Sequence, residues 1–147
     1  MKSGEWRRAA GAGAAWTLVF NLVWGVAWYA FMRAEWTAAT EAAHRSLPWT
    51  AAAWHTWVVV TIPLGVAIMA YAQGRPRPYQ AATIASLGTG LVFQGALAAY
   101  GGAQGLAWRV ILLDTAVTLC AMLAAGLVGA WIAADSADCA TPLRHAV

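Results

Sequence analysis

The chain alternates between long apolar segments and short interruptions that carry charge, glycine or proline. Four apolar segments stand out, at about residues 9–32, 49–73, 79–100 and 106–134. Each is long enough to cross a hydrocarbon core of about 30 Å as a helix that rises about 1.5 Å per residue. The pattern predicts an all-α fold, an integral membrane four-helix bundle. Residues 1–147 would form a single transmembrane domain, with 135–147 as a short polar C-terminal tail.

The interruptions suggest how the four helices connect. Gly74, Pro76 and Pro78 end one predicted helix and start the next. The last two helices are joined by the short sequence GGAQG, so we expect them to be antiparallel neighbours. Pro63 lies inside the second helix and should kink it. The longer connection, RAEWTAATEAAHRSLP, is predicted to be either a short amphipathic helix on the membrane surface or a solvated loop.

Composition excludes a soluble globular protein. Hydrophobic residues make up 61% of the chain, charged residues make up 10%, and the mean hydropathy is +0.58. The formal charge of +3 could suggest a nucleic-acid partner, but the basic residues lie at the ends of the apolar segments. This placement indicates membrane topology instead, so the lipid bilayer is the expected partner and nucleic acid is not.

The distribution of basic residues predicts the orientation. Lys2, Arg7, Arg8, Arg75, Arg77 and Arg144 lie on one side of the membrane in this arrangement, and Arg33, Arg45 and Arg109 lie on the other. Six against three favours both termini in the cytoplasm. The first apolar segment is longer than the core of a signal peptide, so we expect it to be retained as a signal anchor.

Tryptophan is unusually frequent, with ten residues in 147. Trp28, Trp36, Trp49, Trp54, Trp57 and Trp108 fall near the predicted outer ends of the helices, and Trp6, Trp16 and Trp131 fall near the inner ends. Both groups match the aromatic belts found at lipid headgroups. The alternative for the outer group is a stacking surface for a ring-bearing ligand.

Two rows of small residues predict close helix packing. Ala82, Ser86 and Gly90 follow one another at a spacing of four and continue to Gln94. Ala121, Ala125 and Gly129 have the same spacing in the last helix. Small residues let helix backbones approach in a membrane, so these packing ridges are predicted to face each other or a neighbouring subunit.

Asp114 is the most informative polar residue, because a carboxylate inside a membrane helix normally faces protein or water. Counted at about 1.5 Å per residue, Asp114, His55 and Gln94 all come about 9 Å below the outer surface. Asn21 and Trp24 lie somewhat deeper, and Thr118 is one turn from Asp114 on the same face. We therefore predict a polar cluster of these six residues in the outer half of the bundle.

Each member also has a simpler interpretation. Asp114 could act only as an interhelical hydrogen-bond partner. His55 could be an interfacial histidine and not a ligand to haem or a chlorin. Arg109, five residues before Asp114, is on the wrong side of the helix to pair with it and is expected to extend towards the interface. No nucleophile, nucleotide-binding or metalloprotease motif is present in the sequence, so catalysis has no support and no catalytic or metal-ligating residue is assigned.

Short motifs along the chain carry a resemblance to a known group of proteins. They are Asn21 with Trp24, Phe31-Met32-Arg33-Ala34-Glu35, Gly90-Leu91-Val92, Trp108, and Leu112-Leu113-Asp114. In these motifs the chain resembles small four-helix bacterial membrane proteins that form a domain-of-unknown-function family. It departs from their pattern at Asn21, where they have an acidic residue. The resemblance implies a four-helix architecture with Asp114 in the membrane, and it implies no activity.

The resulting hypothesis is a small, non-enzymatic multi-pass protein of the bacterial cytoplasmic (inner) membrane. It would act as an oligomeric or accessory subunit of a membrane complex, with no cofactor defined. One alternative is a small proton-coupled transporter or binding protein for an amphipathic or aromatic solute, with Asp114 as the coupling group. Another is a pigment- or haem-binding subunit that uses His55.

Overall fold

The computed structural model describes residues 3–46 and 50–138, and apart from short connections this part of the chain is helical. The helices are α1 (Ser3–Ala27), the π-helical turn η1 (Trp28–Met32), α2 (Arg33–Ala42), α3 (Ala51–Gln73), α4 (Pro78–Ala103) and α5 (Trp108–Asp138). Four helical stretches are long and apolar enough to cross a membrane, the first being Ser3–Ala42. The prediction of an all-α four-helix membrane bundle is confirmed. By the length and composition of its helices, this is a multi-pass membrane protein.

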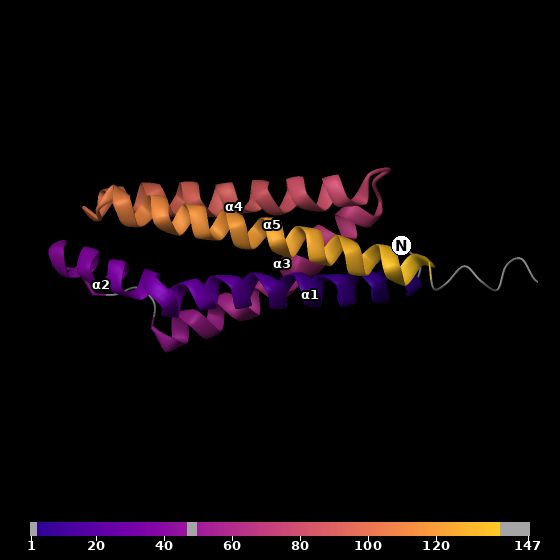
Figure 1. Ribbon diagram of the computed structural model, residues 1–147, viewed down its shortest axis with the longest axis horizontal. Coiled ribbons are helices and arrows are strands. Elements are labelled where there is room, and N and C mark those ends of the chain that lie inside the picture. The colour runs from indigo at the N-terminus through magenta and orange to yellow at the C-terminus, as the bar shows by residue number, and fades with distance from the viewer. Residues whose placement is uncertain (1–2, 47–49, 139–147) are drawn as a thin grey trace, which may run out of the picture.

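The bundle closes in the order α1, α5, α4 and α3, and only the contact between α3 and α4 is sparse. In Figure 1, α4 and α5 run side by side, and α1 and α3 cross below them. The N-terminus and the end of α5 lie at the same end of the bundle (Figure 1). We call the half with the chain ends the inner half. The outer half contains α2 and the connection between α4 and α5.

The first membrane helix is longer than predicted. It was expected to end at Met32, but it begins at Ser3 and continues through η1 and α2 to Ala42. Residues 33–42 therefore continue the first membrane helix and form neither a separate helix nor a loop. Neither glycine nor proline interrupts residues 33–42, and Trp36 and Thr40 extend the row of buried residues on this helix.

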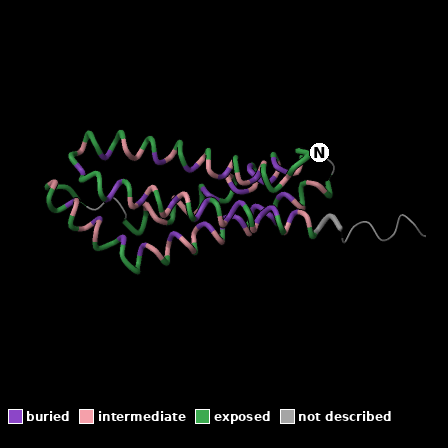
Figure 2. Tube along the Cα trace, turned by 45° about the horizontal axis from the view of Figure 1, so that its top comes forward, coloured by how far each residue is buried: buried purple, intermediate pink, exposed green. Residues whose placement is uncertain are grey.

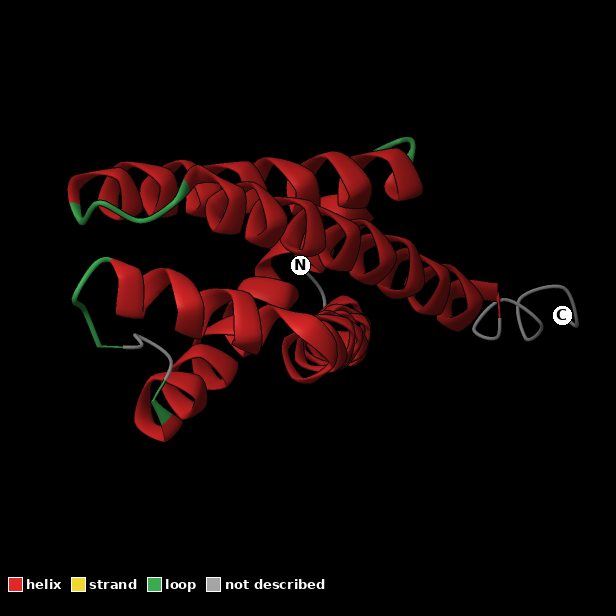
Figure 3. Cartoon of the chain, turned by 60° about the vertical axis from the view of Figure 1, so that its left-hand side comes forward, coloured by secondary structure: helices red, strands yellow, loops and turns green. Residues whose placement is uncertain are grey.

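The helix ends follow local sequence signals. α2 ends with His44 at a φ of 52°, and the Arg45 N–H donates to the Thr40 carbonyl at 2.8 Å. α4 ends in the same way around Gly105, with φ of 75° and Leu106 N–H donating to Gly101 at 2.9 Å. Both are Schellman motifs, in which a left-handed residue satisfies the last carbonyls of a helix. Figure 3 shows the connection between α4 and α5 as a short loop between two long helices.

The ends of α3 and α4 lie within three residues of the predicted ones, and both ends of α5 also differ from the sequence prediction. α5 begins at Trp108 instead of residue 106, and it continues to Asp138. The first residues of the predicted polar tail are thus helical, and residues 139–147 lie outside the described part of the chain.

Several tryptophans that were predicted to anchor the chain at the lipid interface are in fact buried in the bundle. Trp16, Trp28 and Trp36 expose 0%, 8% and 1% of their surface. Trp54 and Trp57 are half-buried, and Trp49 lies outside the described residues. Trp6, Trp108 and Trp131 are exposed, as belt residues should be. The buried positions follow the inner faces of the helices in Figure 2.

The two predicted packing ridges are both buried, but they do not face each other as expected. Ala82, Ser86 and Gly90 face α5 through a different row of that helix. A Cβ added at Gly90 would touch Met122, and one at Gly126 would lie 2.9 Å from Ser86 Oγ. A Cβ at Gly129 would instead meet Met69 of α3 and the Ala12 carbonyl of α1. Ala121 and Ala125 lie on the same face of α5 as Gly129. This ridge therefore packs against α1.

The sequence interpretation missed a close approach between α1 and α3. α1 and α3 cross where Gly13 and Thr17 meet Thr61 and Gly65, a spacing of four on both helices. Thr17 Oγ1 donates to the Thr61 carbonyl at 3.0 Å. A Cβ added at Gly65 would lie 2.6 Å from the Gly13 carbonyl oxygen. Such small-residue pairs allow backbone contact between membrane helices.

Candidate functional site around Asp114

Asp114 lies in the second turn of α5 and is 2% exposed. Its Oδ1 atom accepts hydrogen bonds from Gln94 Nε2 at 3.0 Å and from Thr118 Oγ1 at 3.2 Å. Its Oδ2 atom accepts one from Trp36 Nε1 at 3.0 Å. Both carboxylate oxygens are therefore engaged by donors of the same chain. The three donors come from α2, α4 and α5, so this group ties the outer ends of three helices together.

Gln94 holds the network together because its amide has partners on both sides. Its Nε2 atom donates to Thr118 Oγ1 at 2.8 Å as well as to Asp114. Its Oε1 atom accepts from Thr115 Oγ1 at 3.1 Å. These contacts fix which way the amide points, since the nitrogen faces the carboxylate and the oxygen faces a hydroxyl. The predicted grouping of Asp114, Gln94 and Thr118 is present in the structure.

Trp36 was not predicted as a member of this group. The sequence interpretation ended the first helix at Met32 and assigned Trp36 to the lipid interface. A signal for its true position exists: Trp16, Phe20, Trp24, Trp28, Met32, Trp36 and Thr40 follow one another at a constant spacing of four, and all are buried. The row continues past Arg33 without a break, which indicates that the helix also continues.

The π-helical turn explains how this row remains inside the bundle. In an α-helix of 3.6 residues per turn, positions four apart drift by about 40° around the axis at each step. A wider turn of the π-helical kind compensates for this drift. η1, at Trp28–Met32, ends one helical turn before Trp36. Its extra width turns the Trp36 indole back towards Asp114.

Trp24 and Asn21 have different surroundings. Trp24 makes a weaker side-chain interaction with the Asp114 carboxylate, and it stacks on Trp54 at a centroid distance of 5.1 Å. Asn21 faces α3 instead, where its Nδ2 atom donates to the Thr61 hydroxyl at 3.0 Å and to the Thr17 carbonyl at 2.8 Å. Asn21 thus belongs to the α1–α3 crossing, contrary to the prediction that it joins Asp114.

His55 is not part of the group either. Its side chain is exposed, and it lines a separate depression of about 310 Å³. We call this the His55 depression; it is lined by Trp28, Tyr29, Arg33, Thr50, Ala51, Trp54 and His55. α1 packs against both α3 and α5, while α3 and α5 barely touch. Rotation about the α3 axis, which spacing along the sequence cannot define, turns His55 away from Asp114.

Arg109 behaves as predicted in not pairing with Asp114. It forms an ion pair with Glu35 of α2 at 2.9 Å, in which the Arg109 side chain is 81% exposed. Exposed ion pairs of this kind contribute about 1 kcal/mol or less. The pair lies beside the Asp114 network. Like the hydrogen bond between Trp36 and Asp114, it links α2 to α5.

The hydrogen bonds that the Asp114 carboxylate already accepts limit the chemistry available to it. Its donors occupy both oxygens, and Asp114 lines none of the five main cavities and grooves of the described residues. Among the side chains that the structure describes, in residues 3–46 and 50–135, no group of three His, Cys, Asp or Glu could hold a metal ion. Comparison with protein-family models, characterised proteins and solved structures gives no match.

Proposed function

We propose that this chain is a non-enzymatic subunit of a membrane assembly, formed with its own copies or with another membrane protein. Under this proposal Asp114 orients helices and does not bind a solute. The resemblance to small four-helix bacterial membrane proteins is consistent with such a role and with a bacterial inner-membrane location. The observation that carries the proposal is an open groove between α3 and α4.

The satisfied state of Asp114 supports a structural role for it. A carboxylate that carries protons or cations across a membrane needs a path to water and lone pairs that can accept its cargo. Three donors already occupy both Asp114 oxygens, the indole of Trp36 among them. This arrangement gives less support to the alternative of a proton-coupled transporter.

The α3–α4 groove supports assembly. It measures about 620 Å³ and is lined by Leu64, Ala67, Ile68, Tyr71, Ile84, Ala85, Gly88, Thr89, Val92 and Phe93. All these side chains except Thr89 and Tyr71 are wholly apolar, and several are small. α3 also contains the exposed Pro63, which cannot donate to the Val59 carbonyl, and Val59 is 64% exposed. Small residues and a freed carbonyl are features that a neighbouring membrane helix can use.

A substitution in the groove tests this proposal. Gly88 lines the groove, and a Cβ added there meets no atom within 4 Å. Gly88→Leu should therefore leave the fold intact, fill the groove and reduce the mass of the complex solubilised in mild detergent. Gly11→Leu is the matched control, because Gly11 is an exposed glycine on α1 with equally open space. A wild-type protein that is monomeric in native mass measurements would refute the proposal, as would equal masses for the two variants.

A second candidate function is binding of a ring-bearing ligand in the His55 depression. The indoles of Trp28 and Trp54 line it together with Arg33 and the imidazole of His55. Aromatic walls favour a planar ring, and the imidazole is a potential ligand for a haem or chlorin metal. The absorption spectrum of protein purified from its native membrane tests this candidate. Loss of a visible absorption band in His55→Ala would support it, and a colourless wild-type preparation would exclude a pigment or haem.

A further inference from the structure

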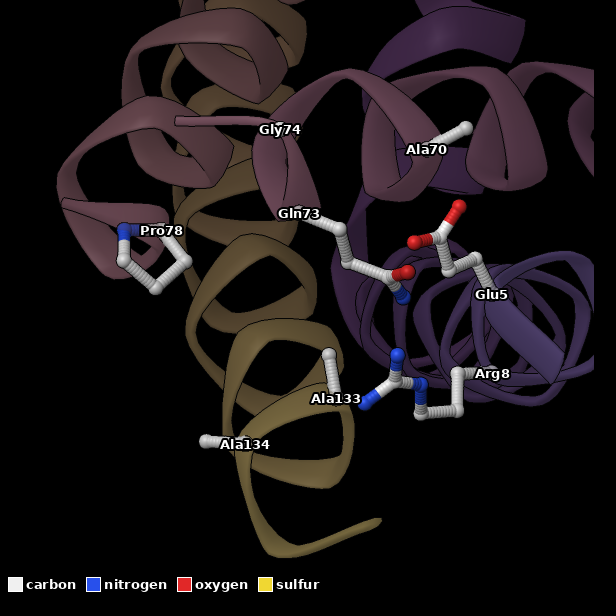
Figure 4. A pocket seen from close by; sticks show the side chains of 8 residues that line it. All are labelled: Glu5, Arg8, Ala70, Gln73, Gly74, Pro78, Ala133 and Ala134. Carbon is white, nitrogen blue, oxygen red and sulfur yellow. The ribbon is translucent and has the colours of Figure 1, made fainter. Parts of the chain in front are cut away.

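A cavity of about 280 Å³ lies in the inner half of the bundle, between the beginning of α1 and the ends of α3 and α5. We call it the Arg8 cavity; Glu5, Arg8, Ala70, Gln73, Gly74, Pro78, Ala133 and Ala134 line it. Figure 4 shows the Gln73 amide reaching into the space between the Glu5 carboxylate and the Arg8 guanidinium. Three polar groups thus converge on one cavity whose other walls are apolar or small.

The Gln73 amide nitrogen indicates that this cavity takes a hydrogen-bond acceptor. Among the described residues, Nε2 of Gln73 is buried and has no hydrogen-bond partner. A buried donor without an acceptor is unfavourable and uncommon in folded proteins. The Arg8 guanidinium, which lines the same cavity, adds further donors and a positive charge. A phosphate group can bind the Gln73 amide and the Arg8 guanidinium together, because its oxygens accept several hydrogen bonds and carry negative charge.

Exposed aromatic side chains around the cavity place it at the depth of lipid headgroups. Trp6 and Trp131 are 53% and 60% exposed, and each is within two residues of a cavity-lining position. Tyr71 and Tyr79 are exposed beside Gln73 and Pro78. Tryptophan and tyrosine gather where a membrane helix passes the headgroups. At that depth a phospholipid is the most concentrated source of phosphate.

We propose that the Arg8 cavity binds the headgroup of a phospholipid with a phosphate and a primary ammonium group. Arg8 and Gln73 hold the phosphate, and Glu5 faces the ammonium. Arg75 and Arg77 are exposed near the same end of the bundle and attract the anionic part of the headgroup. Sites for drug-sized ligands typically measure about 300–1,000 Å³. The Arg8 cavity is smaller, which suits a lipid headgroup.

Native mass spectrometry of the full chain tests this proposal. The protein is reconstituted in equal amounts of phosphatidylethanolamine and phosphatidylglycerol, extracted in mild detergent and analysed for retained lipid. We expect the wild type to retain phosphatidylethanolamine. Arg8→Gln should lower its apparent affinity about tenfold or more, because the bonds lost are charge-assisted. Arg7→Gln removes the same charge from the neighbouring, exposed residue and should leave retention unchanged.

Two further variants separate a lost site from a lost fold. Arg8→Lys keeps the charge and should retain more lipid than Arg8→Gln, with unchanged helical content by circular dichroism for both. Glu5→Gln should shift the preference from phosphatidylethanolamine towards phosphatidylglycerol. Equal retention by Arg8→Gln and Arg7→Gln would overturn the proposal. So would displacement of the lipid by an excess of inorganic phosphate, which would identify a site for free phosphate.

Discussion

The two halves of the bundle are held together by different means. In the inner half, backbones come into direct contact at Gly13 and Gly65, and glycines of α5 pack under Ser86 and Met69. In the outer half, polar side chains on α2, α4 and α5 meet at Asp114. Close backbone contact depends on the absence of side chains, whereas the Asp114 network depends on the presence of particular ones. The two halves should therefore respond to opposite kinds of substitution.

The largest effect is expected where a side chain is added in the inner half. Gly65→Ala would place a Cβ 2.6 Å from the Gly13 carbonyl and 2.8 Å from Thr17 Oγ1. Because one of these atoms belongs to the backbone, α1 and α3 must separate, which should lower the free energy of unfolding by about 3 kcal/mol. Unfolding in mixed micelles measures this change. Gly11→Ala is the control, since its Cβ would meet nothing within 4 Å; equal effects would contradict direct backbone packing.

Trp36→Phe alone isolates a single bond of the Asp114 network. It keeps an aromatic ring in the buried position but removes the Nε1 donor, which leaves Asp114 Oδ2 short of a partner. We expect a loss of about 2 kcal/mol in the free energy of unfolding. The control is Trp108→Phe, at a tryptophan that is 61% exposed, where the loss should be much smaller. A similar loss for both would show that the Asp114 contact is not decisive.

The smallest effect is expected at the surface of the same helix pair. Arg109→Gln removes the exposed ion pair with Glu35, and the expected loss is about 0.5 kcal/mol or less. A double-mutant cycle with Glu35→Gln in mixed micelles measures the coupling between the two residues. A coupling as large as the effect of Trp36→Phe would mean that the ion pair, and not the buried network, joins α2 to α5.

Much of the site followed from sequence, and the errors at His55 and Asn21 have one origin. Asp114, Gln94 and Thr118 were grouped correctly because two of them share a face of one helix and the third comes from the adjacent antiparallel helix. His55 was placed in the same group on depth alone. The depth of a residue in the membrane depends on its position along the helix, whereas the direction of its side chain depends on which neighbours the helix packs against. The packing of α3 on α1 turns His55 outward.

The sequence by itself determined the number of membrane helices, most of their ends and the presence of a buried carboxylate. These features depend on runs of apolar residues and on local breakers such as Gly74 and Pro78, which act within a few residues. Only the tertiary structure decided that Trp36 completes the Asp114 network, that Asn21 serves the α1–α3 crossing, and that Gly13 meets Gly65. Those contacts join residues far apart in the chain, and they depend on helix rotation, which a π-helical turn can change without any glycine or proline to indicate it.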